Sequence, residues 1–68
     1  MNGVMLKSVM VLNGDTIRDL AEYLHISPQS TSDKINERGT EFKLGEIQMI
    51  KEKYRLSPDQ VDAIFFNG

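Results

Sequence analysis

The stretch TIRDLAEYLHISPQSTSDKIN, residues 16–36, decides the fold. It contains the signals for two short helices, over residues 16–24 and 28–36, with very few residues between them. Since so short a connection forces a sharp angle between two helices, the stretch predicts an angled helix pair. Helical periodicity alone would suit a simple bundle equally well.

Each helix of the pair has its own start signal. Thr16 offers a hydroxyl to cap the first helix, and Asp19 three residues later completes a pattern like a capping box. Ser27 and Pro28 start the second helix, because serine is a favoured cap and proline suits the first helical position. Both starts are therefore predicted from local chemistry alone.

Apolar residues in this stretch repeat with the period of a helix. In the first helix they fall at i, i+3, i+4 and i+7, at Ile17, Leu20, Ala21 and Leu24. The second helix points only Thr31 and Ile35 inward. The small side chain of Ala21 lets the second helix cross closely, so packing between the two helices is expected to fix their angle.

The outer face of the second helix has no apolar residue. It consists of short polar side chains, Gln29, Ser30, Ser32, Asp33 and Asn36. Side chains with both donors and acceptors are what a helix needs to read base edges in the major groove of DNA. The alternative is an ordinary solvated face on a structural helix.

Outside residues 16–36 the chain predicts three more helices, over residues 4–12, 44–54 and 58–65, and no sheet. The last starts at Ser57 and Pro58, whereas the helix from residue 44 has a poor cap. We therefore expect an all-α, five-helix single domain over residues 1–68, with residues 1–3 frayed. Its expected core is Leu6, Val9, Met10, Leu20, Ala21, Leu24, Ile26, Ile35, Phe42, Leu44, Ile47, Ile50, Val61, Ile64 and Phe65.

Composition excludes several classes of function. The chain has no cysteine, which rules out disulfides and thiolate sites, and no apolar run long enough for a membrane span. No catalytic motif is present, and a chain of 68 residues is poorly suited to enclosing a substrate. His25 is the single histidine and is interpreted as a turn residue. We expect a cytoplasmic protein that is not an enzyme and has no cofactor, metal or small-molecule substrate.

One family matches the longer pattern of residue types. Residues 16–36 can be written Thr16-x-x-Asp19-Leu20-Ala21-Glu22-Tyr23-Leu24-x-Ile26-Ser27-x-Gln29-Ser30-x-Ser32-x-Lys34-Ile35-Asn36, followed by Glu41-Phe42-x-Leu44-x-Glu46-Ile47-x-x-Ile50 and Leu56-x-x-x-x-Val61-x-x-Ile64-Phe65. This pattern resembles the lambda-repressor-like, Cro/C1-type (XRE) helix-turn-helix family. It is most similar to short phage and prophage regulators of Gram-positive bacteria, and covers nearly the whole chain.

The resemblance implies a DNA-binding transcriptional regulator of the repressor type, with residues 16–36 as a helix-turn-helix. The helix over residues 28–36 would enter the major groove of double-stranded DNA. Carried over by position, the base-reading residues would be Gln29, Ser30, Ser32 and Asp33. The phosphate-contacting residues would be Arg18, Lys34, Arg38 and Lys43.

Three residues depart from the family pattern. His25 stands where the turn usually has glycine, and a left-handed conformation there costs histidine more. Asp33 stands where a basic or amide side chain is commoner; its carboxylate accepts from a cytosine amino group but repels phosphate. Thr31 replaces a larger aliphatic residue and weakens packing of the second helix.

The net charge of −2 leaves more than one function open. Nucleic-acid binders usually carry a basic surplus, although cations gathered on one face still attract DNA. The first hypothesis is a sequence-specific regulator. The second is a protein-interaction module that kept this fold and lost specific DNA binding, and the third is an accessory protein that binds DNA mainly non-specifically.

A sequence-specific regulator of this size is expected to act as a weak dimer, because one reading helix covers only a few base pairs. The candidate contact is an apolar patch on the last helix, formed by Val61, Ile64 and Phe66. The rival is a monomer in which Phe66 folds back against the first helix.

Overall fold

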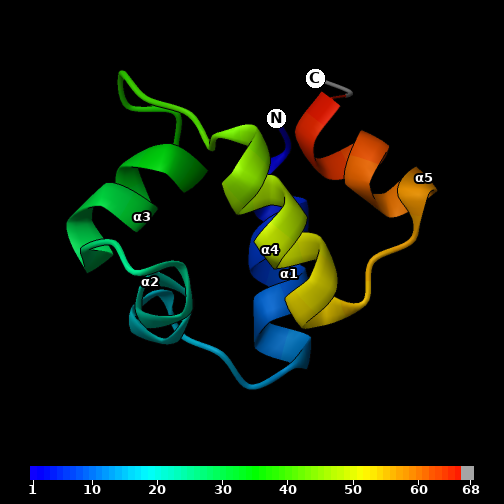
Figure 1. The fold of residues 1–68 in the computed structure, drawn as a ribbon, viewed down its shortest axis with the longest axis horizontal. Helices are drawn as coiled ribbons and strands as arrows, with labels where there is room; N and C mark the ends of the chain where they lie inside the picture. The colour runs from blue at the N-terminus through cyan, green and yellow to red at the C-terminus, as the bar shows by residue number, and fades with distance from the viewer. Residues whose placement is uncertain (67–68) are drawn as a thin grey trace.

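The computed structural model describes residues 1–66, and within them the chain is all-α with five α-helices and no strand. Figure 1 shows α4 crossing in front of α1 at the centre, with α2 and α3 on one side and α5 on the other. The bounds are α1 Gly3–Leu12, α2 Ile17–Leu24, α3 Pro28–Ile35, α4 Leu44–Tyr54 and α5 Pro58–Val61, continued by a π-helical turn η1, Asp62–Phe66. The all-α prediction with five helices is confirmed.

Membrane insertion has no support among the described helices. None of those within residues 1–66 combines the length and the apolar character that crossing a bilayer requires.

Local caps start the helices where the sequence predicts. At α2 the Asp19 N–H donates to Thr16 Oγ1 (3.2 Å) and the Thr16 N–H donates to Asp19 Oδ2 (2.8 Å), which completes the capping box. Ser27 Oγ accepts from the Ser30 N–H at 3.0 Å, directly before Pro28. These bonds satisfy backbone donors that have no partner inside the helix.

The connection from α2 to α3 turns at His25. This residue is left-handed, with φ 60° and ψ 38°, at the C-cap of α2. Its N–H donates to the carbonyl of Glu22, and the next N–H, of Ile26, donates to that of Ala21. The connection is therefore only three residues long and leads directly into the Ser27 cap.

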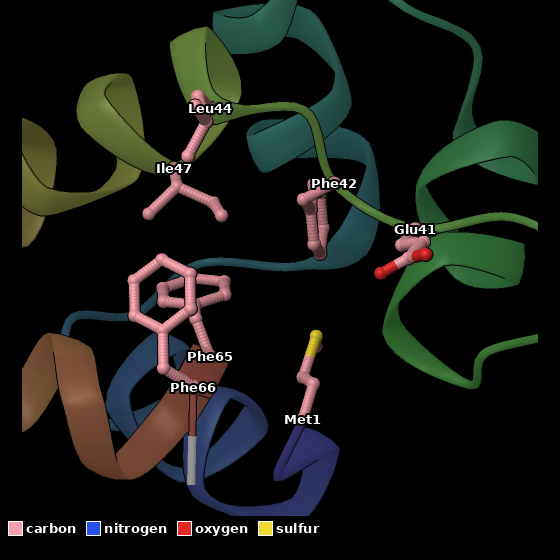
Figure 2. Close-up of a pocket in the computed structure, with 7 residues that line it drawn as sticks. All are labelled: Met1, Glu41, Phe42, Leu44, Ile47, Phe65 and Phe66. Atoms are coloured by element: carbon pink, nitrogen blue, oxygen red, sulfur yellow. The ribbon is translucent and has the colours of Figure 1, made fainter. Parts of the chain in front are cut away.

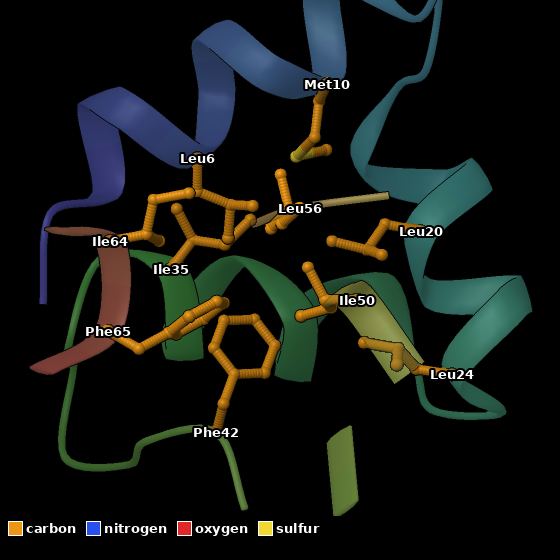
Figure 3. Packing of buried hydrophobic residues seen from close by; sticks show 10 residues of the cluster. All are labelled: Leu6, Met10, Leu20, Leu24, Ile35, Phe42, Ile50, Leu56, Ile64 and Phe65. Carbon is orange, nitrogen blue, oxygen red and sulfur yellow. The ribbon is translucent and has the colours of Figure 1, made fainter. Parts of the chain in front are cut away.

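The core lies where α1, α2, α3, α4 and η1 converge (Figure 3). Its buried cluster is Leu6, Met10, Leu20, Leu24, Ile35, Phe42, Ile50, Leu56, Ile64 and Phe65. Ala21 and Thr31 are also buried, and the Thr31 hydroxyl donates to the Ser27 carbonyl at 3.0 Å. The rings of Phe42 and Phe65 meet edge to face, with centroids 6.0 Å apart.

The predicted core needs three corrections. Leu44 is 76% exposed, because it lies on the outer side of the first turn of α4. The side chains of Val9, Ile26, Ile47 and Val61 only border the core and are partly buried. Leu56, which the prediction omitted, is a core residue.

The start of the chain is also better anchored than predicted. Residues 1–3 were expected to fray, yet α1 begins at Gly3 and Asn2 caps it, accepting from the Met5 N–H at 3.1 Å. The Asn2 N–H also donates to the carbonyl of Ile64 at 2.6 Å. A Cβ on Gly3 would lie 2.6 Å from the carbonyl oxygen of Ile35, so glycine permits α1 to approach the end of α3.

Candidate nucleic-acid interface

The exposed side of α3 carries all four residues predicted to read bases. Gln29 is exposed, while Ser30, Ser32 and Asp33 are half-buried. Thr31 and Ile35 lie on the opposite, buried side of the helix. Because residues 29, 32 and 33 follow the helical period, their side chains share one polar surface, which we call the α3 face.

A hydrogen bond inside the α3 face orients Gln29. Its Nε2 donates to Asp33 Oδ1 at 3.0 Å, one helical turn further on. Gln29 therefore keeps its amide oxygen and one N–H free toward solvent. An acceptor and a donor side by side are the groups that pair with the edge of adenine in the major groove.

Arg38 joins the α3 face from outside the helix. Its guanidinium donates to Ser32 Oγ at 3.0 Å and lies 3.6 Å from Asp33 Oδ1. The chain brings it back through Glu37, which is left-handed with φ 54°, so that the Arg38 N–H donates to the Asp33 carbonyl at 2.8 Å. Arg38 stays 57% exposed, so its charge still faces solvent while it is balanced by Asp33.

Lys34 is not part of this surface, and its prediction as a phosphate contact is wrong. The residue is only 8% exposed, and its Nζ lies 2.8 Å from each carboxylate oxygen of Glu46 in α4. The helical period contained the signal, because Lys34 is three residues after the buried Thr31 and next to Ile35. The positive charge of Lys34 is therefore paired with Glu46 inside the protein.

The Glu46 carboxylate links α3 to the start of α4. Besides binding Lys34, the Glu46 carboxylate accepts from the backbone N–H of Lys43 at 2.8 Å. This bond caps the start of α4, where the Lys43 side chain itself makes no capping bond. Burial raises the pKa of Glu46. The hydrogen bonds from Lys34 and the Lys43 N–H, and the charges of both lysines, outweigh that effect and hold the pKa below its usual range. Glu46 is thus the anion that positions α3 against α4.

The two remaining predicted cations lie outside α3 and are not buried. Arg18 is exposed in the first turn of α2, and Lys43 is exposed at the start of α4. Within residues 1–66 neither forms an ion pair with an acidic side chain. A cation that was not predicted, Lys7 of α1, donates to Asn36 Oδ1 at 3.2 Å at the end of α3.

A second polar cluster supports the α2 side of the domain. The Tyr54 hydroxyl donates to Asp15 Oδ2 at 2.7 Å, and Lys53 lies 3.3 Å from the same oxygen. Lys53 also lies over the ring of Tyr23, 4.8 Å from its centroid. Burial, the bond to Asp15 and nearby negative charges raise the pKa of Tyr54, so its hydroxyl stays protonated. This cluster holds the end of α4 against the loop before α2.

The predicted dimer patch on the last helix is not exposed as a unit. Ile64 is fully buried and Val61 is partly buried, so their prediction as contacts for a second subunit is wrong for Ile64 and weakened for Val61. Phe66 is 59% exposed. With Leu44, Ile47 and Phe65 it lines a groove of about 230 Å³ between η1 and the start of α4 (Figure 2).

Comparison with known proteins adds no family assignment. No protein-family model matches the chain, and neither the curated proteins nor the solved structures contain a significant match.

Proposed function

We propose that this chain is a DNA-binding transcriptional regulator in which α2, the turn at His25 and α3 form a helix-turn-helix. The observation that carries the proposal is the α3 face. It is polar throughout, exposed at Gln29 and half-buried at Ser32 and Asp33, and it follows α2 after a three-residue connection. A helix presented in this way can enter the major groove with its side chains against base edges.

Sequence reading is assigned to the first turns of α3. Gln29 pairs with adenine through its free amide oxygen and its free N–H, with Asp33 holding the amide in the required orientation. Asp33 itself accepts from an amino group of cytosine, while Ser30 and Ser32 donate or accept according to the base. Each well-made bidentate pair contributes about 1–3 kcal/mol of discrimination.

Phosphate binding is assigned to Arg38, which contacts the α3 face, and to the exposed Arg18 and Lys43. Each neutralised phosphate adds roughly −0.9 to the slope of log affinity against log salt concentration. Three such contacts give a modest slope, in keeping with a chain of net charge −2. Affinity for random DNA is therefore low, and the base contacts carry more of the selectivity than in a strongly basic protein.

The proposal is tested by fluorescence polarisation with duplexes selected from a randomised pool. Arg38→Ala should weaken binding to all duplexes alike and flatten the salt slope by about one unit, whereas Gln29→Ala should relax preference at one base pair. The matched control is Arg55→Ala, which removes an exposed arginine at the end of α4 remote from α3 (Figure 1). If the Arg38→Ala and Arg55→Ala proteins have the same DNA affinity at every salt concentration, Arg38 does not contact a phosphate and the proposed placement of α3 on DNA is wrong.

One observation favours a second candidate, a protein-interaction module that keeps the fold without binding DNA specifically. Asp33 neutralises Arg38 and bonds to Gln29, and Lys34 is used by Glu46, so the α3 face offers little free positive charge. This candidate predicts that the protein selects no duplex from the pool even at low salt. A selected consensus sequence would exclude it.

A further inference from the structure

Asn36 carries the α3 face on to the end of α3. It follows Gln29 by seven residues and Asp33 by three, so the helical period places it on the same side of the helix. Its amide nitrogen donates to the Ser32 carbonyl at 2.9 Å and to Ser32 Oγ at 3.4 Å. Because both bonds use the nitrogen, the amide oxygen is left to bind a group from elsewhere in the fold.

The amide oxygen of Asn36 accepts from Lys7 of α1, whose Nζ lies 3.2 Å from Oδ1. The two helices come together here because Gly3, one helical turn before Lys7, has no Cβ to meet the carbonyl oxygen of Ile35. Both Lys7 and Asn36 are exposed. The fold thus places an ammonium group from α1 at the end of the α3 face, on the solvent side.

Lys7 is held by a neutral partner. Lys34, Lys53 and Arg38 each lie within ion-pair distance of a carboxylate, which balances their charge. Within residues 1–66 no acidic side chain lies that close to the Lys7 ammonium. The Asn36 amide therefore orients the ammonium without neutralising it, and the positive charge remains available to an anion.

We propose that Lys7 contacts a DNA phosphate at the carboxyl end of α3, so that the interface with DNA extends onto α1. The inference rests on the proposed function, in which α3 lies in the major groove. A helix with its side chains is about 10–12 Å across and the groove is about 12 Å wide, so phosphates lie directly beside the inserted helix. A cation that is bonded to the α3 face but comes from a neighbouring helix stands at these phosphates rather than at the bases.

Asn36 is the positioning residue for this contact. A lysine side chain loses rotamer freedom when it binds a phosphate, and this loss weakens binding. The bond to Asn36 restricts Lys7 before DNA arrives, so less freedom is lost on binding. Asn36 is uncharged, so it affects affinity without changing the number of counterions that DNA releases. The two residues therefore differ in their effect on salt dependence.

Binding of a selected duplex at several salt concentrations, measured by fluorescence polarisation, separates the two roles. Lys7→Gln should weaken binding about tenfold at low salt and flatten the slope of log affinity against log salt concentration by about 0.9. Asn36→Ala should weaken binding by less and keep the slope of the wild type. The matched control is Arg55→Gln, which also removes one exposed positive charge, at the end of α4. A Lys7→Gln protein with the slope and affinity of Arg55→Gln overturns the proposal.

Arg38→Ala keeps a failure of this inference apart from a failure of the proposed function. If Arg38→Ala flattens the salt slope and Lys7→Gln does not, α3 meets DNA without help from α1, and only the contact of Lys7 is wrong. A wild type that selects no duplex from the pool contradicts both.

Lysine acylation of the wild type, followed by mass spectrometry, tests the contact without any variant. A saturating amount of the selected duplex should slow acylation of Lys7 severalfold. Acylation of Lys51, in the last turn of α4, should keep its rate and serves as the internal control. An unchanged rate at Lys7 in the presence of bound duplex would contradict the phosphate contact.

Discussion

His25 shows how one residue holds a turn at a cost in stability. It adopts φ 60° and ψ 38°, a conformation that crowds the Cβ of any residue except glycine. We predict that His25→Gly raises the free energy of unfolding by about 0.5–1 kcal/mol, measured by urea denaturation. His25→Ala keeps the Cβ and should gain nothing from the backbone. If His25→Gly is the less stable of these two variants, the histidine ring stabilises the turn in some other way.

Asp33 is the residue that limits DNA affinity in the proposed function. Its carboxylate lies 3.6 Å from the Arg38 guanidinium, and a phosphate has to compete with it. Asp33→Asn frees Arg38 and should tighten binding to random duplexes by about tenfold while reducing selectivity. Asp59→Asn removes the same charge from α5, on the other side of the molecule, and should change little (Figure 1). Equal gains in DNA affinity for both variants would mean that the effect comes from net charge alone and not from the release of Arg38.

At the scale of elements, the Lys34–Glu46 pair fixes α3 against α4. Their side chains are only 10% and 13% exposed, so removing one partner leaves an almost buried charge. Lys34→Met should therefore lower the free energy of unfolding by about 3 kcal/mol, whereas Lys34→Met with Glu46→Met should recover most of that loss. Thermal or urea unfolding of both variants checks this, and a double variant no more stable than the single one would contradict it.

The same pair predicts an acid sensitivity. Because the folded protein holds the pKa of Glu46 below its value in the unfolded chain, this contribution to stability is complete above about pH 4.5 and is lost as the pH falls through the folded pKa. Urea unfolding between neutral pH and about pH 3 should show a shallower acid loss for Glu46→Gln than for the wild type. Parallel curves would mean that Glu46 contributes nothing to the acid transition.

Gly45 and Gly3 both lie in the first turn of a helix, but only Gly3 packs closely against another helix. A Cβ on Gly45 meets nothing within 4 Å, so Gly45→Ala should stabilise α4 by about 0.5–1 kcal/mol. A Cβ on Gly3 meets the Ile35 carbonyl at 2.6 Å, so Gly3→Ala should destabilise the protein by about 1–3 kcal/mol despite the same gain in propensity. Chemical denaturation of the two variants measures both, and a stabilising Gly3→Ala would show that α1 does not pack closely on α3.

Helix positions were predictable because their signals are local, whereas several side-chain orientations were not. The caps at Thr16, Ser27 and Ser57 begin helices where expected. Leu44 points outward because it lies six positions before the buried Ile50 in α4. At about 100° per residue, this spacing places the two side chains about 120° apart around the helix. The helical period already places Lys34 on the buried side of α3, but its partner Glu46 is twelve residues away in sequence, so no local pattern reports that ion pair.

The whole molecule combines the polar α3 face with a separate exposed apolar surface on α1. Lys7, Arg18, Arg38 and Lys43 are the cations proposed to contact phosphates, while Val4, Val11 and Leu12 on α1 are exposed. The helix that carries the predicted base-reading residues is confirmed as Pro28–Ile35, while their role in reading bases stays a prediction. The sequence placed the dimer contact on the last helix, because it did not show that Ile64 is covered by the rest of the fold.

The proposed function requires the α3 face to be the surface that meets DNA. The most direct measurement is the two-dimensional ¹H–¹⁵N spectrum of labelled protein titrated with a duplex selected from a randomised pool. We predict that the amide signals of residues 29–33 and of Arg38 move most, and that those of α5 stay in place. Shifts concentrated away from α3, or no shift at low salt, would contradict DNA binding through the α3 face.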